Sequence, residues 1–246
     1  MRLKKSLGQH LLVAPQILNT IVKFANIKPE EIVVEIGPGT GNFTQFLLKT
    51  PLKKLILIEI DKNMIEILKE KIKDSRVNLI CADATQFDFS ILKEQNIKVV
   101  GNLPYNVASL IIENIVKHKQ IIYEAYIMIQ KEVAERLQST SSWLGIFVST
   151  FYKIEYLMTI PPRFFVPPPK VDSALISLKR EQTNLQIDPT TYKKFLTQIY
   201  RNKRKILRHK IKEEILLKAK ISPNKRVEEL SLEEFLKLFQ IWKEVI

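Results

Sequence analysis

The sequence is poor in the residues that build disulfide frameworks and metal centres. It contains one cysteine, Cys81, and three histidines, and no two of these histidines stand at a metal-ligand spacing. A disulfide framework and a cysteine-built metal site are therefore excluded, and we expect no metal. The apolar run around Cys81, residues 77–82, predicts that this cysteine is a buried strand residue.

Long apolar runs and acidic residues are also scarce. No run is long enough to span a bilayer, and the amino terminus, which contains Lys4 and Lys5, lacks the apolar core of a signal peptide. We therefore expect a cytoplasmic protein without a membrane partner. The 26 Asp and Glu residues stand against 39 Lys and Arg residues, a formal net charge of +13. This excess favours a polyanionic partner, and nucleic acid is the first candidate.

Glycine is scarce as well, with only six residues, but three of them lie in one stretch. They are Gly37, Gly39 and Gly41, and they follow the β-branched run 32–36. This pattern predicts a buried parallel strand and a tight bend at its carboxyl end, where open α/β sheets bind ligands. Gly37 and Gly39 would let a ligand lie against bare backbone. The alternative is a bend that only connects the strand to a helix.

The same alternation of strand and helix patterns continues along the chain. Further strands are predicted at residues 55–61, 77–81, 97–102 and 123–129, and helices at 15–24, 62–72, 108–116 and 131–137. Repeated βα units argue for a doubly wound α/β sheet. Two last strands, 153–160 and 171–179, are joined by a proline-rich loop without a helix, which predicts an antiparallel hairpin at the edge of the sheet.

Acidic side chains follow two of these strands. Glu59 lies about twenty residues beyond the glycines, where an acid can bind a ribose diol, and Asp61 is placed to cap the next helix. Asp83 follows the third strand and could accept a hydrogen bond from an exocyclic amine such as that of adenine. A plain turn aspartate is the alternative for Asp83, and a structural strand-end acid is the alternative for Glu59.

The turn Asn102-Leu103-Pro104-Tyr105 permits a specific reaction. An aminated base stacked on Tyr105 could donate its NH₂ group to the Asn102 side-chain oxygen and the Leu103 carbonyl, which frees the nitrogen lone pair from the ring. Pro104 prevents the strand from pairing further. The nitrogen is then a nucleophile for a sulfonium methyl group, so we expect S-adenosyl-L-methionine as cofactor, bound over the glycine bend.

A second, helical domain is predicted from residue 182, so we divide the chain into domains 1–181 and 182–246. Its helices are expected at residues 192–200, 205–218 and 232–245. Basic residues crowd its first half and are our candidates for RNA binding, together with two in the amino-terminal arm: Arg201, Lys203, Arg204, Lys205, Arg208, Lys4 and Lys5. The alternatives are a solvated helix face and a solvated tail.

These motifs together carry a resemblance that extends over the whole chain. They are Ser6-Leu-Gly-Gln-His-Leu-Leu12, Val34-Glu-Ile-Gly-Pro-Gly-Thr-Gly41, Glu59-Ile-Asp61, Asp83-Ala84, Asn102-Leu-Pro-Tyr105 and Pro167-Pro-Pro-Lys-Val-Asp-Ser173. The sequence resembles the small-subunit (16S) ribosomal RNA adenine N6-dimethyltransferases of the KsgA type. The resemblance implies a class I methyltransferase fold with a mostly parallel seven-stranded sheet and a small helical carboxyl-terminal domain.

The resemblance also implies residue roles and a substrate. Residues that line the cofactor site would include His10, Leu12, Gly37, Glu59, Asp83 and Asn102. Phe165 would join Tyr105 around the target base, although Phe164 and Phe165 as simple core residues are the alternative. The substrate would be two adjacent adenosines in the 3′-terminal hairpin loop of small-subunit rRNA, methylated by a monomer during subunit assembly.

Two other functions stay open from the sequence. The first is dimethylation of large-subunit rRNA, as in the macrolide-resistance relatives that share the catalytic motif. The second is a non-catalytic RNA-binding assembly factor on the same fold. The intact Asn102, Pro104 and Tyr105 argue against a loss of catalysis.

Overall fold

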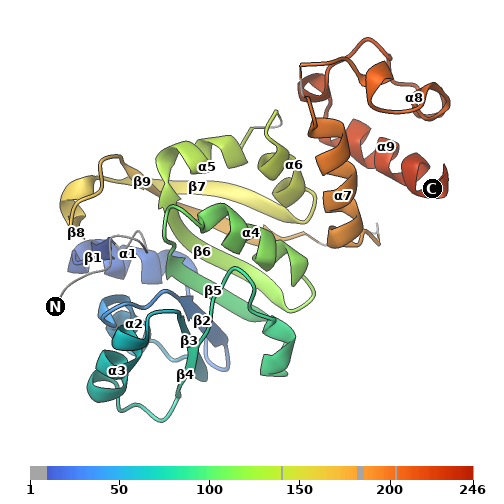
Figure 1. The fold of residues 1–246 in the computed structure, drawn as a ribbon. Helices are drawn as coiled ribbons and strands as arrows, with labels where there is room; N and C mark the ends of the chain where they lie inside the picture. Colours follow the sequence, from blue (N-terminus) through green and yellow to red (C-terminus); the bar gives the residue numbers. More distant parts are fainter. Residues whose placement is uncertain (1–9, 140, 182–185, 203, 246) are drawn as a thin grey trace. The chain divides into compact units, whose positions relative to one another are not determined.

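The computed structural model describes residues 10–139, 141–181, 186–202 and 204–245, and Figure 1 shows the course of the chain. The chain divides into two compact units. The first contains the chain up to Ala134 together with Lys153–Arg180, and the second contains Glu135–Tyr152 and Glu181–Ile246. The second unit therefore draws on a segment before residue 153 as well as on the region from residue 182 that the sequence indicates.

A seven-stranded sheet with the order β4-β3-β2-β5-β6-β9-β7 forms the centre of the first unit (Figure 1). Its strands are β2 (Ile32–Ile36), β3 (Lys54–Glu59), β4 (Val77–Cys81), β5 (Ile97–Asn102), β6 (Ile122–Gln130), β7 (Tyr152–Ile160) and β9 (Ser173–Arg180). The pairs from β4 to β6 are parallel, and β9 runs antiparallel to β6. The mostly parallel seven-stranded sheet is thus confirmed. β7 and β9 are neighbours at the edge, where the sequence places a hairpin.

Helices alternate with these strands. They are α1 (Pro15–Ala25), α2 (Asn42–Leu47), α3 (Lys62–Lys71), α4 (Ala108–Lys117) and α5 (Lys131–Leu137), with a 3₁₀ turn η2 (Phe89–Leu92). Proline occupies the first turn of α1, where its missing N–H is not needed. The Asp61 side chain accepts a 3.0 Å hydrogen bond from the backbone N–H of Asn63, so Asp61 caps α3 as expected.

The strand order reverses at β2, which lies between β3 and β5. Ile36, the last residue of β2, pairs with Ile58 on one side and with Gly101 on the other. The glycine bend after β2 and the turn after β5 therefore begin side by side. Such a switch point, at the carboxyl ends of the strands, is where open α/β sheets bind ligands.

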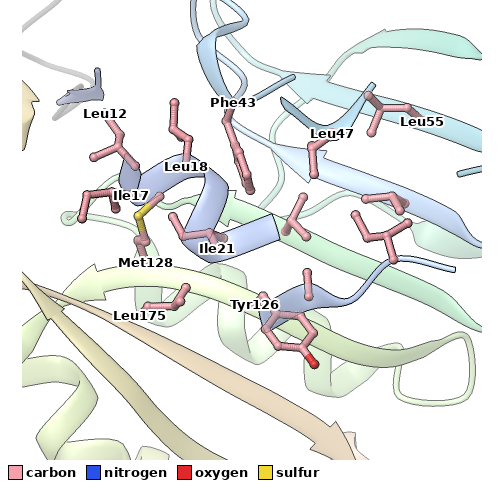
Figure 2. Close-up of a cluster of buried hydrophobic side chains, with 14 of the residues drawn as sticks. Leu12, Ile17, Leu18, Ile21, Phe43, Leu47, Leu55, Tyr126, Met128 and Leu175 are labelled. Atoms are coloured by element: carbon pink, nitrogen blue, oxygen red, sulfur yellow. The ribbon is translucent and has the colours of Figure 1, made fainter. Parts of the chain in front are cut away.

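A hydrophobic cluster holds the described part of the amino-terminal arm, residues 10–12, and the following helix α1 against this sheet (Figure 2). Two short strands, β1 (Leu11–Leu12) and β8 (Phe165–Val166), form a separate antiparallel pair in which Leu12 pairs with Phe165. Both side chains belong to the cluster and are 5% and 2% exposed. A 3₁₀ turn, η3 (Pro162–Phe164), leads into β8. Burial of these two side chains holds Leu12 next to the proline-rich loop. That loop contains Pro162, which lies 150 residues after Leu12 in the sequence.

The second unit is helical and has an aromatic core. Its elements are α6 (Trp143–Ser149), α7 (Pro189–Tyr200), η4 (Leu207–His209), α8 (Glu213–Ala219), η5 (Val227–Glu229) and α9 (Leu232–Val245). Tyr192 and Phe195 of α7 contact Phe239 of α9, with ring centroids 4.9 and 5.5 Å apart. Helix α6 was not expected from the sequence. The ring of its residue Phe147 stacks on the ring of Tyr192, with centroids 6.5 Å apart.

The expected helix at residues 205–218 is wrong in its first half. The backbone N–H groups of Leu207 and Arg208 donate to the carbonyls of Lys225 and Pro223, and Ile206 forms an isolated bridge with Arg226. These donors are therefore not available to a helical hydrogen-bond ladder. Only a short 3₁₀ turn forms there, and the α-helix begins later, at α8.

The expected burial of Cys81 is also wrong, because its side chain is exposed. Cys81 ends β4, which is the first strand in the sheet order and so an edge strand. An edge strand lacks a neighbour on one side, so part of its surface stays open to solvent. Across the described ranges, no helix is long and apolar enough to cross a membrane.

Candidate active site

A pocket opens at the switch point of the sheet. Its lining includes nine of the residues predicted from the sequence, which are His10, Gly37, Gly39, Glu59, Asp83, Asn102, Leu103, Pro104 and Tyr105. A smaller pocket adjoins it, since both are lined by Leu11, Gly37 and Asn102. Leu12 lines this smaller pocket. The structure thus brings the two predicted turns and the amino-terminal arm together in one place.

The glycine bend contributes to both pockets, because Gly37 lines both of them and Gly39 lines the larger one. Gly37 and Gly39 have φ angles of +66° and +55°, which other residues rarely adopt. A Cβ atom on Gly39 would lie 2.7 Å from the Leu11 side chain of the arm. The bend therefore needs glycine for its backbone conformation, and the Leu11 side chain of β1 lies directly against it.

Glu59 fastens this bend to the end of β3. Its Oε2 accepts from the backbone N–H of Gly39 at 3.1 Å, and its Oε1 accepts from those of Ile60 and Asp61 at 2.9 Å each. Burial raises the pKa of the carboxyl group, although the three backbone hydrogen bonds act in the opposite direction. A carboxylate has about four acceptor sites, so one remains for a ligand hydroxyl.

Asp83 lies on the loop after β4, and a buried residue of α4 supports that loop. Asp83 Oδ1 accepts from the backbone N–H of Thr85 at 2.8 Å, a turn contact that leaves Oδ2 for a ligand donor. The Asn114 side-chain amide donates to the carbonyls of Ala84 and Phe87 at 3.0 and 2.9 Å. Asn114 is 6% exposed and was not predicted as a site residue. It positions the loop without lining the pocket.

Asn102, the last residue of β5, carries the most informative contact of the site. Its Nδ2 donates to the backbone carbonyl of His10 at 2.5 Å. Its Oδ1 is buried and has no hydrogen-bond partner in the described part of the chain. Because an unpaired buried acceptor is costly, its presence at a pocket indicates a ligand that donates a hydrogen bond.

Tyr105 is held between the arm and β9. Its ring stacks on the His10 ring with centroids 5.4 Å apart, and its hydroxyl hydrogen-bonds with the Ser173 hydroxyl at 2.5 Å. Burial raises the pKa of Tyr105, so the phenol stays neutral. The His10 Nδ1 lies 2.8 Å from the Pro167 carbonyl and must carry the proton, since a carbonyl only accepts. His10 thus links Asn102, Tyr105 and the proline-rich loop.

Phe165 is not brought to the pocket. Its side chain is 2% exposed and packs in the hydrophobic cluster, which agrees with the alternative interpretation of this residue as core. Its placement around the target base stays a prediction. Besides Asn114, residues that were not predicted include Ser173, which holds Tyr105, and Ile60, which lines the pocket and is 49% exposed. Ile60 lies one residue past the end of β3, and its position directly after Glu59, the acid expected at the ribose, is the signal that could have found it.

The predicted RNA-binding residues lie in the second unit and in the arm. Four of them lie on the segment from the end of α7 to η4, and all four are exposed: Arg201, Arg204, Lys205 and Arg208. Lys4, Lys5 and Lys203 lie outside the described residues. Among the residues that the structure describes, no cluster of His, Cys, Asp or Glu could hold a metal ion.

These features define a class of protein. A glycine bend, a carboxylate that holds it and an unpaired amide oxygen meet at the switch point of a mostly parallel seven-stranded sheet. The residues present fit S-adenosylmethionine, since Gly37 and Gly39 leave bare backbone and both Glu59 and Asp83 retain acceptor sites for an adenosine. The protein is an S-adenosylmethionine-dependent methyltransferase.

Comparison with known proteins identifies the family. A family model described as ribosomal RNA adenine dimethylase matches residues 1–244, and the chain belongs to this family. It is 44% identical to ribosomal RNA small subunit methyltransferase A of Sulfurihydrogenibium sp. (strain YO3AOP1), over 97% of this chain and 95% of the relative. It is 42% identical to the protein of that name from Persephonella marina, over 97% and 93%.

Solved structures agree with this assignment. A dimethyladenosine transferase from Plasmodium falciparum is 28% identical and superimposes with a TM-score of 0.82, covering 96% of this chain and 99% of that chain. The 23S rRNA methyltransferase ErmE is 23% identical, has a TM-score of 0.71 and shares the fold. Family membership makes the protein a ribosomal RNA adenine dimethyltransferase whose methyl donor is S-adenosylmethionine.

Proposed function

We propose that the protein dimethylates the N6 amines of two adjacent adenosines in the 3′-terminal hairpin loop of small-subunit rRNA, during assembly of the small subunit. The names of its relatives from Sulfurihydrogenibium and Persephonella support the choice of subunit. The observation that carries the chemistry is the unpaired, buried Oδ1 of Asn102 beside the glycine bend. An adenine amine is the kind of donor that this oxygen lacks.

The cofactor would lie across the glycine bend. Glu59 would accept from the ribose hydroxyls through its remaining acceptor site, and Asp83 Oδ2 would accept from the adenine amine. His10 and Leu12 would close the site from the side of the arm. When bound, S-adenosylmethionine supplies a sulfonium methyl group to a nucleophile held in line with it.

The target base would be held by the turn after β5. The Tyr105 ring, fixed by Ser173, offers an aromatic surface on which a base can stack. Asn102 Oδ1 and the Leu103 carbonyl would then accept from the amine, and Pro104 keeps this turn out of the sheet. Two acceptors favour a tetrahedral nitrogen, so they stabilise the transition state more than the planar ground state.

We further propose that the basic residues hold RNA through its phosphates. Arg201, Arg204, Lys205 and Arg208 are exposed, as phosphate contacts require, and Lys203, Lys4 and Lys5 extend the set in sequence. Since the proposed substrate is an assembling ribosomal subunit, we place the enzyme in the cytoplasm. We propose that it acts as a monomer.

The experiment that tests this function is methyl transfer to under-methylated small subunits with labelled cofactor, followed by mapping of the modified bases. We expect two adjacent dimethyladenosines near the 3′ end of small-subunit rRNA. Label in large-subunit rRNA alone would favour the macrolide-resistance type of activity. Binding of particles without any transfer would favour a non-catalytic assembly factor.

A further inference from the structure

One histidine stands among the cations that we propose to bind RNA, and it has no role so far. The basic segment, residues 201–212, contains seven Lys and Arg residues and His209, but no Asp or Glu. His209 ends the 3₁₀ turn η4, and its side chain is exposed. The two other histidines, His10 and His118, are half-buried, and their rings are hydrogen-bonded in the first unit. His209 is thus the histidine with an exposed side chain in the proposed RNA-binding surface.

Hydrogen bonds to two neighbouring elements hold the basic segment in a defined shape. The backbone N–H of Arg208 donates to the Pro223 carbonyl at 3.0 Å. The Lys210 ammonium group donates to the carbonyl of Ile199, in the last turn of α7, at 2.7 Å. Lys210 is half-buried and supports α7, whereas Arg208 and His209 beside it are exposed. The segment therefore presents a cation and a histidine, adjacent in the chain, to solvent.

Positive charges dominate around His209. Charged and titratable residues on the elements that pack against the basic segment include Tyr192, Lys193, Lys194 and Tyr200 of α7, Glu213, Glu214 and Lys218 of α8, and Lys225, Arg226, Glu228 and Glu229 of residues 222–229. Glu214 lies 3.9 Å from Lys212, and Glu234 of α9 lies 2.7 Å from Lys225, so these two carboxylates face lysines. A phosphate would therefore meet His209 beside several cations and no acid of the same segment.

A protonated histidine suits a phosphate, because both ring nitrogens then donate and the contact is charge-assisted. Histidine changes charge between about pH 5 and 8, and a phosphate nearby favours its charged form. We propose that His209 takes up one proton from the solvent when RNA binds to the basic segment and then contacts a phosphate, so that RNA binds more tightly at acidic pH. The inference rests on the proposed RNA binding by this segment.

The salt dependence of RNA binding measures the additional phosphate contact. We would titrate the full chain, without cofactor, into a fluorescently labelled RNA hairpin that has the 3′-terminal sequence of small-subunit rRNA, at pH 6.0 and pH 8.5 and at several salt concentrations. The slope of log affinity against log salt should be steeper at pH 6.0 by about 0.7–0.9, the contribution of one neutralised phosphate. At constant salt the affinity should fall as the pH rises.

Three variants assign the effect to His209. The α-amino group and the other histidines titrate in the same pH range, so the quantity of interest is the difference between the wild-type chain and His209→Gln. His209→Gln should have the shallower slope at both pH values and match the wild-type affinity at pH 8.5. His209→Lys carries a permanent charge and should keep the steeper slope at both. His118→Gln is the matched control in the first unit and should keep the wild-type pH dependence.

The outcomes separate this inference from the function on which it rests. Equal pH dependence in the wild-type chain and His209→Gln would overturn the role of His209 and leave RNA binding by the basic segment intact. Loss of the pH dependence in His118→Gln would overturn it as well, because the titrating group would then lie in the first unit. If the wild-type chain did not bind the hairpin at either pH, the proposed RNA binding itself would fail, and this inference with it.

Discussion

The side-chain nitrogen of Asn102 lies 2.5 Å from the backbone carbonyl oxygen of His10. Because that oxygen can only accept, the contact defines which end of the amide is nitrogen, and it leaves Asn102 Oδ1 buried without a partner in the described chain. Such an atom costs about 1–3 kcal/mol until a donor arrives. The His10 carbonyl therefore fixes the orientation of the Asn102 amide, whose Oδ1 is the acceptor that we propose for the target amine.

The first prediction concerns this acceptor. Asn102→Ala should lower the single-turnover rate of methyl transfer by about 10²-fold or more, because it removes an interaction that is strongest in the transition state. The affinity for S-adenosylhomocysteine should stay within a few-fold. Asn78→Ala, on the exposed surface of β4, is the control and should transfer at the wild-type rate. Rates near wild type in Asn102→Ala would refute the catalytic role.

The second prediction concerns Glu59. Glu59→Ala should weaken binding of S-adenosylmethionine by about 1–3 kcal/mol, because a hydrogen bond to the ribose and the anchor of Gly39 are removed together. RNA affinity should barely change. Glu66→Ala, an exposed acid on α3, serves as control in the same calorimetric titration. Unchanged cofactor affinity would reduce Glu59 to a structural strand-end acid.

The sequence predicts those parts of the site that depend on residues close together in the chain, and it predicts contacts between distant residues less well. The glycine bend and the Asn102 turn are local patterns, and the rule that ligands bind at carboxyl strand ends brings them together. The burial of Phe165 was only one of two alternatives from the sequence, since it depends on pairing of β8 with β1, far away in the chain. The positioning roles of Asn114 and Ser173 likewise exist only after folding.

For the basic segment after α7, the exposure of the side chains agrees with the sequence, but the helix predicted there does not form. Their charge is a property of composition, so an exposed position was expected for Arg204, Lys205 and Arg208, and the structure has it. The helix prediction was wrong because Leu207 and Arg208 donate to a loop near residue 224. In this segment the pattern of charges therefore predicted side-chain exposure correctly, whereas the spacing of hydrophobic residues predicted the wrong backbone conformation.

The third prediction tests RNA binding by these residues. Replacing Arg204, Lys205 and Arg208 with glutamine should reduce the slope of log affinity against log salt by about 0.7–0.9 for each phosphate that is no longer neutralised. Tyr105→Ala should keep the slope and slow transfer instead, because base stacking is worth about 1–3 kcal/mol. Both variants would be titrated on the same RNA. An unchanged slope in the triple variant would remove these residues from the RNA-binding surface.

The fourth prediction concerns the support of the Asp83 loop. Asn114→Ala leaves the carbonyls of Ala84 and Phe87 without their donor, so the free energy of unfolding should fall by about 1–3 kcal/mol. If Asn114 positions Asp83, the variant should also discriminate less between S-adenosylhomocysteine and S-inosylhomocysteine, which lacks the adenine amine. A loss of stability with full discrimination would limit Asn114 to a structural role.

The last prediction concerns Glu35, an acid on β2 whose pKa is raised by its burial. The pKa is about 8 in the folded protein against an ordinary value of 4.5. Between these values the folded state keeps a proton that the unfolded state has released, so the free energy of unfolding should fall as the pH rises, by up to about 1.4 kcal/mol per pH unit. Asp74, whose pKa the Arg76 side chain lowers to about 2, acts only at more acidic pH and does not interfere.

Glu35→Gln removes this titration but can still accept the hydrogen bond from Thr44. Without cofactor, the variant should therefore gain stability over the wild-type chain as the pH rises from 5 to 8, and the difference should level off above that range. Urea unfolding of both proteins at pH 5, 6.5, 8 and 9 measures it. Parallel stability curves would show that Glu35 does not titrate in this window.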